Sequence, residues 1–591
     1  MAPLFFANGP GFVSLILRAK IISDLVRMDL NLGTDRPFIL LGWAYLLTLG
    51  STISPRCSVM NPKPTKGLEQ LAKQLDQELS GWLAALNLAP TTPADQYVPD
   101  VNAAYEQLKA GMGRSSDVLL RKVQVPACRE DVVLIACLDG MADTQMVDQD
   151  IIQRLMSTKS APDTWDQTDM TPVHISQEKS WSKILQDLAA GNTLIFAPGL
   201  AFVWIVDTVK YKQRAIERPQ TELSVRGTEE AFNEILLTQK NQIRRHLLTP
   251  TLQFHDIVVG RVQHTTVSVA YLEDVTNSAL VDVAIKRLEA IKIDGVANST
   301  AIAGLIRDHP RSVFPTMRST ERVDIVIWRL LEGAVVILTE GDPFALIAPS
   351  PLVDFYRTAM DYSSSWADSS FVRMIRFAGW ILGMYLPALY LALADVNPNV
   401  LPTELFVVMQ GSHAGLPFPP TVEMVLMILV IEILRESALR LPKVLSVTLG
   451  TVGAIVVGTA VVKAGLVDPQ IIVIMTLTAL SLFSTPVYEL TGTWRVFGFF
   501  LLLGGALLGI LGVVLVTMGA LAVMMDMETF GVPYFAPWAP LRLPDWKDTI
   551  VRVPWTNFVT RWHSTRAQRA GWRTPVEVSG RPHLLKRRRS S

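Results

Sequence analysis

Long apolar stretches cluster after Ser370, and they restrict the fold more than any other feature of the sequence. They cover residues 377–394, 421–441, 444–462, 471–488 and 496–525. A helix that crosses a membrane needs about 20 predominantly apolar residues. Hydrophobic residues make up 49% of the chain and charged residues only 18%, a balance untypical of soluble globular proteins. We therefore predict a multi-span helical membrane domain over residues 371–530.

Residues 60–370 have a mixed α/β pattern. Short β-branched runs predict strands at 132–138, 193–197, 256–262, 267–271 and 334–339. Helical patterns occur at 68–88, 228–247 and 280–291. The charged stretch 210–219 predicts a boundary between soluble subdomain 1 (60–206) and soluble subdomain 2 (207–370). The expected fold is an α/β soluble N-terminal region of two subdomains followed by an α-helical transmembrane domain.

The two ends of the chain differ from the main body. Residues 1–59 form an atypical N-terminal extension with an apolar segment at 37–53, either a translated upstream extension or an additional anchor. Residues 531–591 predict a basic cytoplasmic tail. Basic residues also precede the first apolar stretch, so we expect both ends of the membrane domain on the cytoplasmic side. Four full crossings plus one charged helix satisfy this expectation.

The overall composition argues against several classes of protein. A formal net charge of zero gives no sign of nucleic-acid binding. The three cysteines (Cys57, Cys128 and Cys137) lack CxxC spacing and the eight histidines do not cluster, so we expect no metal and no cofactor. P-loop, HExxH and GxSxG motifs are absent from the sequence, and we expect no enzymatic activity. A secondary transporter would show internal repeats, whereas a structural scaffold remains an alternative.

The stretch 421–441 is the only apolar stretch that carries several charges. At 100° per residue, its charged residues beyond the first turn fall within an arc of about 140°; these are Glu432, Arg435, Glu436 and Arg440. Charges inside a bilayer are costly and need partners or water. Three interpretations remain open: a pore or subunit junction, an interfacial helix with its charges in water, and structural pairing within the membrane.

Small residues recur at a spacing of four in two other stretches, and this spacing places them on one helix face, where they allow helix backbones to approach closely. We predict helix packing at Gly450, Ala454, Gly458, Gly505 and Gly509. The stretch 496–525 is expected to form one helix, which at about 1.5 Å per residue exceeds the thickness of the hydrocarbon core.

Several motifs, in order along the chain, resemble one protein family. They are ERPQTELSVRG at 217–227, ERVD at 321–324, GDPFALI at 341–347 and EILRESALRLP at 432–442. The sequence is similar at these places to the GerA family, the A subunits of spore germinant receptors. Val323 stands where the family usually has proline, which leaves room for a divergent paralogue.

The resemblance implies two cytoplasmic subdomains and a membrane domain in the inner membrane of the bacterial spore. The implied partners are a transporter-like B subunit, a lipoprotein C subunit, further copies of the chain in a homo-oligomer, and membrane lipid. The implied function is that of a nutrient germinant receptor subunit in a ring-shaped ligand-gated ion channel. A SpoVAF-like germination amplifier, which releases ions downstream of receptors, and a non-conducting structural membrane subunit are the alternatives.

Residues 60–370 produced alone should be soluble, because the apolar stretches begin only after them. Two subdomains with separate cores should unfold as two cooperative units, which differential scanning calorimetry of the fragment measures. An aggregated fragment, or a single calorimetric transition, would contradict the proposed boundary near residues 206 and 207.

Overall fold

The computed structural model describes residues 97–126, 132–157, 174–210, 218–440, 442, 453, 456–558, 560–562, 565–569 and 571. The predicted extension at 1–59, the predicted helix at 68–88 and most of the apolar stretch at 444–462 lie outside these residues.

The first sheet contains five antiparallel strands in the order β1-β2-β4-β5-β3. Its elements are α4 (Val101–Ala110), η1 (Met112–Arg114), β1 (Val118–Gln124), β2 (Val132–Leu138), η3 (Met146–Ile152), α5 (Gln153–Ser157), β3 (Ile175–Glu178), α6 (Trp181–Ala189), β4 (Thr193–Phe196) and β5 (Val203–Val206). The predicted strands at 132–138 and 193–197 correspond to β2 and β4. The other three strands were not predicted.

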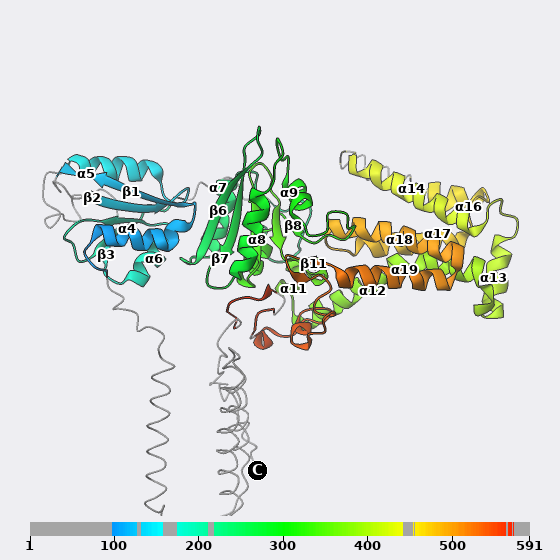
Figure 1. Ribbon diagram of the computed structural model, residues 1–591. Coiled ribbons are helices and arrows are strands. Elements are labelled where there is room, and N and C mark those ends of the chain that lie inside the picture. Colours follow the sequence, from blue (N-terminus) through cyan, green and yellow to red (C-terminus); the bar gives the residue numbers. More distant parts are fainter. Residues whose placement is uncertain are drawn as a thin grey trace, which may run out of the picture. The chain divides into compact units, whose positions relative to one another are not determined.

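Both faces of the first sheet are covered by helices (Figure 1). On one face, Leu134 and Ala136 of β2 pack with residues of α4 and α6. On the other face, Ile135 and Cys137 pack with residues of η3 and α5. Because successive side chains of a strand point to opposite faces, a strand buried on both sides needs a continuous apolar run. The sequence of β2 satisfies this requirement.

The second sheet also contains five antiparallel strands, in the order β6-β7-β9-β10-β8. Its elements are α7 (Leu236–His246), β6 (Leu252–Val259), β7 (Thr265–Leu272), α8 (Ser278–Glu289), α9 (Ser299–Ile306), β8 (Arg318–Thr320), α10 (Val323–Leu331), β9 (Val335–Thr339) and β10 (Ala345–Ala348). Strands predicted at 256–262, 267–271 and 334–339 overlap β6, β7 and β9, and the helix predicted at 280–291 overlaps α8.

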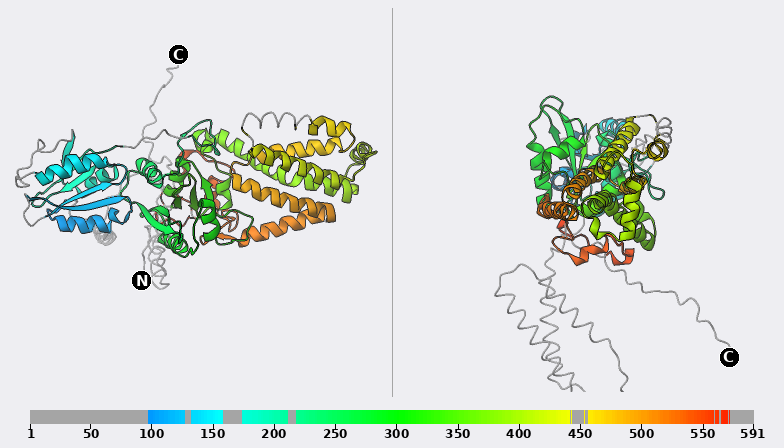
Figure 2. Two further views of the ribbon diagram at one scale, coloured as in Figure 1. Left: turned by 90° about the horizontal axis from the view of Figure 1, so that it is seen from above. Right: turned by 90° about the vertical axis from the view of Figure 1, so that its right-hand side faces the viewer.

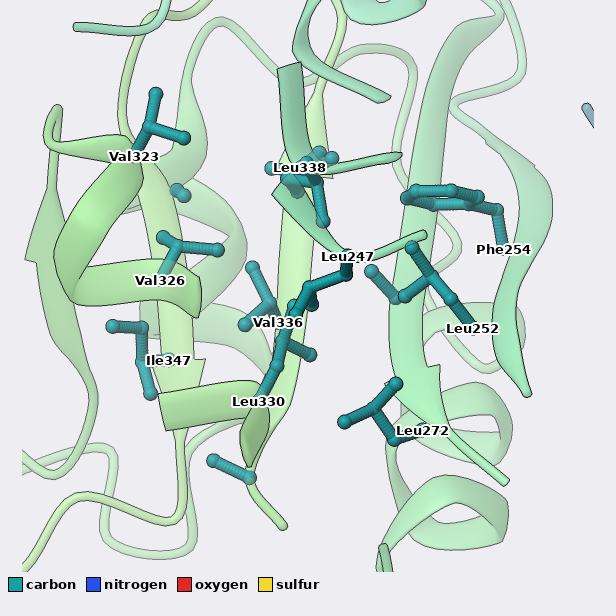
Figure 3. Packing of buried hydrophobic residues seen from close by; sticks show 14 of the residues in the cluster. Leu247, Leu252, Phe254, Leu272, Val323, Val326, Leu330, Val336, Leu338 and Ile347 are labelled. Atoms are coloured by element: carbon teal, nitrogen blue, oxygen red, sulfur yellow. The ribbon is translucent and has the colours of Figure 1, made fainter. Parts of the chain in front are cut away.

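Helices cover both faces of the second sheet as well. Helices α7 and α10 supply one core, in which Val326 and Leu330 of α10 pack against Val336, Leu338 and Ile347 of the sheet (Figure 3). Helices α8 and α9 supply the core on the opposite face. Each sheet region therefore has its own hydrophobic core on either side.

The helix predicted at 228–247 begins only at Leu236. The preceding residues form backbone contacts with distant segments instead: Phe232 N donates to Glu321 O at 2.8 Å, and Gly341 N donates to Glu234 O at 2.8 Å. These tertiary hydrogen bonds replace those of a helix, and local periodicity carries no information about them.

The described residues between 352 and 526 form a mainly helical region. Its elements are η6 (Leu352–Phe355), α11 (Ala359–Ser363), α12 (Trp366–Leu391), η7 (Ala392–Val396), η8 (Pro398–Val400), α13 (Thr403–His413), α14 (Pro420–Arg440), η9 (Val456–Ala460), α16 (Val461–Lys463), α17 (Pro469–Phe483), α18 (Tyr488–Leu508) and α19 (Ile510–Asp526). Helices α12, α17, α18 and α19 lie side by side (Figure 2). Among the described residues, Trp366–Val396 and Tyr488–Leu508 are long and apolar enough to cross a membrane, and Pro469–Phe483 and Ile510–Asp526 are shorter apolar helices.

The apolar stretch 496–525 is divided into two helices. The chain turns at Gly509, where φ is +63° and ψ is −142°. A residue with a Cβ rarely adopts such a φ, and a Cβ here would lie 1.9 Å from Asn397 Oδ1. Asn397 Oδ1 accepts a hydrogen bond from Ile510 N at 3.0 Å and so stabilises the start of α19. The expected single long helix is thereby replaced by a helical hairpin.

Glycines set several close helix contacts. A Cβ on Gly505 would lie 2.6 Å from Ala388 O of α12, and one on Gly512 would lie 1.9 Å from Gly504 O. On α12, a Cβ on Gly383 would meet Ser481 Cβ of α17 at 3.1 Å. Of the other predicted packing residues, Gly458 is exposed with no atom within 4 Å of its Cβ position, and Gly450 and Ala454 lie outside the described residues.

After α19 the chain returns to the second sheet. The hairpin of β11 (Glu528–Thr529) and β12 (Val532–Pro533) is held there, because Thr529 Oγ1 donates to Thr316 O at 2.7 Å. The helices η10 (Leu543–Lys547) and η11 (Trp555–Asn557) follow. Arg561 Nε donates to Leu331 O at 2.7 Å. The segment that was predicted to be a basic tail thus has a packed part, and its most basic stretch lies outside the described residues.

Gly505→Leu should destabilise the helical region, because a side chain at this position must separate α18 from α12. Overpacking of this kind costs about 1–3 kcal/mol. We expect a lower melting temperature and a smaller yield of monodisperse protein in detergent. Gly411→Leu is the matched control, since Gly411 lies in α13 with no atom within 4 Å of its Cβ position. Equal stability of the two variants would show that the α12–α18 contact tolerates a larger residue.

Candidate functional site

Glu432 lies at the centre of a charged contact between α14 and α18. Its Oε1 accepts a hydrogen bond from Arg435 Nη1 at 2.8 Å, and its Oε2 accepts one from Arg495 Nη1 at 2.9 Å. Arg435 is three residues further along α14, whereas Arg495 belongs to α18. One carboxylate therefore joins two guanidinium groups from two helices.

The contact borders a small cavity of about 70 Å³ between four helices. Met384 of α12, Met475 of α17 and Trp494 of α18 line this cavity together with Glu432 and Arg435. The side chain of Arg435 is 17% exposed and that of Glu432 is 37% exposed. These charges are therefore partly removed from water. An ion pair in such an environment is stronger than one in water.

The other two predicted charges form a separate pair. Arg440 Nη2 donates to Glu436 Oε1 at 2.5 Å, and the two side chains are 79% and 62% exposed. An exposed pair of this kind contributes about 0–1 kcal/mol. The predicted face of α14 therefore has an inner part with Glu432 and Arg435 and an outer part with Glu436 and Arg440.

A second polar cluster lies at the other end of α14. Glu423 Oε2 accepts from the backbone N of Asp468 at 2.8 Å, and Ser412 Oγ donates to Asp468 Oδ2 at 2.8 Å. His413 Nδ1 lies 3.7 Å from Glu423 Oε1. Both carboxylates are fully buried. They occupy the first turn of α14 and the N-cap of α17, where helix dipoles favour negative charge.

A larger network of buried ion pairs joins the second sheet to α12 and to the C-terminal segment. Asp548 Oδ1 pairs with Arg373 Nη1 of α12 at 2.7 Å, and Asp548 Oδ2 pairs with Arg357 Nη2 at 3.2 Å. Arg357 Nη1 also lies 3.3 Å from Asp354 Oδ1, and Asp354 Oδ2 lies 2.8 Å from Arg329 Nη2 of α10. Glu332 Oε1 lies 3.7 Å from Arg357 Nη1, and Asp361 Oδ2 lies 2.8 Å from Arg373 Nε. Together these residues form the junction network: Arg329, Glu332, Asp354, Arg357, Asp361, Arg373 and Asp548.

The ionisation of the acids in the junction network follows from their neighbours. Burial opposes the charged form of Asp548, but Arg357 and Arg373 outweigh it and hold the pKa of that carboxyl below its usual range. Burial has the larger effect at Glu332 and raises its pKa, although Arg329 and Arg357 oppose this effect. The network therefore depends most clearly on a charged Asp548.

Within the described ranges, no group of three or more His, Cys, Asp or Glu side chains has the arrangement needed to hold a metal ion.

A sequence profile described as Bacillus/Clostridium GerA spore germination protein matches residues 106–564. The chain belongs to the GerA family. Spore germination protein KA of Bacillus subtilis (strain 168) is 33% identical over 462 residues, which cover 77% of this chain and 85% of that protein. Spore germination protein B1 of the same strain is 32% identical over 466 residues, which cover 78% of this chain and 96% of that protein.

Among solved structures, the chain is similar to the N-terminal domain of the A subunit of the Bacillus megaterium spore germinant receptor GerK3. The sequence identity is 28% and the TM-score is 0.34, with coverage of 43% of this chain and 96% of that chain.

Two of the GerA-like motifs, those at 217–227 and 321–324, lie together in the second subdomain. Glu321 Oε1 accepts a hydrogen bond from Thr221 Oγ1 at 2.7 Å, and Arg322 Nη1 donates to Glu222 O at 3.1 Å. Glu222 Oε1 in turn accepts from Arg318 Nη2 at 3.0 Å. The acidic and basic residues of these motifs thus fix a loop against β8 and α10.

Two residues of these polar contacts, Arg495 and Asp468, were not predicted from the sequence of this GerA-family chain. Arg495 immediately precedes an apolar stretch, and a lone cation there signals a partner elsewhere in the helical region. Asp468 precedes Pro469, and an aspartate followed by proline is a sequence signal for the start of a helix. In contrast, the junction network combines residues that are up to about two hundred positions apart, and no local pattern indicates it.

Asp548→Asn should strongly destabilise the chain, because it leaves Arg357 and Arg373 with too little compensating charge. Removing one partner of a buried pair costs about 3–5 kcal/mol, which thermal unfolding of the purified protein measures. The pKa of Asp548 is lowered by folding, so its stabilisation is present above the unfolded pKa of about 4. It disappears as the pH falls through the folded value.

The difference between wild type and Asp548→Asn should therefore be largest at neutral pH and shrink at acidic pH. Glu436→Gln is the control and should change the melting temperature little, because its pair is exposed. A small effect of Asp548→Asn at neutral pH would contradict the importance of the junction network.

Proposed function

We propose that this chain is an A-type subunit of a nutrient germinant receptor and that it spans the inner membrane of the spore. Its helical region leaves the second sheet domain at α12 and returns to it after α19, where Phe530 N donates to Asp308 Oδ2 at 2.8 Å. A region that starts and ends at the same domain crosses a membrane an even number of times. This supports a position of the sheet domains and the C-terminal segment on the same side of the membrane, and the basic residues that precede the first apolar stretch favour the cytoplasmic side.

The contact of Glu432 with Arg435 and Arg495 is the single observation on which the proposed ion path or junction at α14 is based. Charged side chains within apolar helices are expensive and mark ion paths or moving junctions. Glu432 pairs with a residue of α18, and α14 also contacts α12 and α17. This arrangement favours a pore or junction over a helix that lies alone on the membrane surface.

In this proposal, further copies of the chain form a homo-oligomeric ligand-gated channel, with a transporter-like B subunit and a lipoprotein C subunit as partners. Nutrient binding by the complex changes the contact between α14 and α18 and opens the ion path. The outer pair of Glu436 and Arg440 is exposed and lies beyond that path.

Arg435→Glu should abolish germination or cause constitutive ion leakage while the protein level stays near normal. The change places a second acid beside Glu432, and Arg495 alone must then compensate for both. Arg440→Glu is the matched control, because its pair is exposed and contributes about 0–1 kcal/mol. Germination assays of spores that carry each variant, with potassium retention and immunoblots, measure these effects. Normal germination and ion retention in Arg435→Glu would refute the proposed role.

A charge exchange across the two helices tests the geometry. Glu432→Arg combined with Arg495→Glu places the acid on α18, within reach of two basic residues on α14. We expect each single change to impair function and the double change to restore part of it, as for residues that interact directly. Single-channel recording of the reconstituted complex separates a conducting subunit from a scaffold. A double variant no better than the single variants, or a complex that never conducts, would overturn the proposed ion path.

A further inference from the structure

A cavity of about 680 Å³ lies where the second sheet domain meets α18 and α19. Its volume is within the range of about 300–1,000 Å³ that is typical of ligand pockets. The loop between α9 and β8 forms one wall, and the facing sides of α18 and α19 form the others. This cavity is separate from the one beside Glu432.

The walls of the cavity change character along its length. Phe500 of α18 and Val523 of α19 line the helical part, and they are 52% and 51% exposed. His309 and Arg311 line the end at the loop, and Asp526 lies at the C-terminal end of α19. The cavity therefore has an apolar part between helices and a polar part at the sheet domain.

The walls are held in place by contacts between the loop and both helices. Thr493 Oγ1 of α18 donates to Val313 O at 2.8 Å, and Ser312 Oγ lies 3.3 Å from Met527 Sδ. The rings of Phe314 and Trp494 pack edge to face with their centroids 6.1 Å apart. These contacts keep the loop and the helices from closing the cavity.

Among the described residues, two charged groups at the polar end have no charged partner. Within the part of the chain that the structure describes, Arg311 and Asp526 form neither an ion pair nor a side-chain hydrogen bond. Both are exposed. A ligand that carries both a negative and a positive group would match this arrangement, and the apolar walls would suit a hydrocarbon chain.

We propose that this cavity binds a phospholipid whose headgroup carries a phosphate and an ammonium group. One acyl chain lies between α18 and α19, the phosphate lies near Arg311, and the ammonium group lies near Asp526. The inference rests on the proposed insertion of these helices into the membrane. A lipid bound here touches the loop of the second sheet domain and both helices at once, and so strengthens their connection.

Gly519→Phe tests the proposal in the full-length protein. Gly519 lines the cavity, and outside its own helix backbone no described atom lies within 4 Å of its Cβ position, so a side chain here extends from an open position into the cavity. Gly411→Phe is the matched control, because Gly411 lies in α13 with equally open space around it. Each protein is reconstituted in nanodiscs of phosphatidylethanolamine and phosphatidylglycerol. Native mass spectrometry then counts the phospholipids that stay bound to the protein after its release from the nanodiscs.

We expect wild type and Gly411→Phe to retain phosphatidylethanolamine. The amount of this lipid bound to Gly519→Phe should be at least tenfold lower. Arg311→Glu should weaken retention of both lipids, whereas Asp526→Asn should reduce the preference for phosphatidylethanolamine over phosphatidylglycerol. Equal retention in Gly519→Phe and wild type would overturn the site. A change in the number of chains per complex without loss of lipid would also overturn the site, because the cavity would then be part of a contact between copies of the chain. Sedimentation of each variant with membranes reports separately on insertion itself.

Discussion

The buried charges of Arg357, Arg373 and Asp548 impose the strictest condition on this structure. Each is almost completely removed from water, and a buried charge without a partner costs several kcal/mol. The three residues come from the end of the second sheet domain, from the start of α12 and from the C-terminal segment. None of these parts can move away without exposing or isolating a charge. The sheet domain and the first long helix are therefore mechanically joined, and motion in one must be transmitted to the other or must break the network.

The same chain places two kinds of contact between its helices, and they have different consequences. Glycine contacts, such as that of Gly505 with Ala388, fix backbones at close distance and have one favourable arrangement. The contact of Glu432 with Arg435 and Arg495 depends on side chains instead, because its two carboxylate oxygens bind the two guanidinium groups at the same time. Glycine contacts thus suit a rigid frame around α12, α17, α18 and α19. The charged contact connects α14 to α18 of that frame.

Much of the fold follows from local patterns, and the limits of prediction have a physical cause. Strand β2 was placed correctly because burial on both faces requires an uninterrupted apolar run. Periodicity predicts one helix over 496–525 because it ignores a single residue such as Gly509, whose positive φ turns the chain. The charges of Glu432 and Arg435 stand out in an apolar stretch of the sequence, but their partner Arg495 lies 63 positions after Glu432. The junction network was missed for the same reason.

The position of Asp548 also determines when the protein can finish folding. Asp548 follows Arg357 by 191 residues. At about 5–20 residues per second, the ribosome needs on the order of 10–40 s to make that stretch. During this time the guanidinium groups of Arg357 and Arg373 lack the carboxylate of Asp548. A chain that ends before residue 548 therefore leaves the buried Arg357 and Arg373 without one of their carboxylate partners.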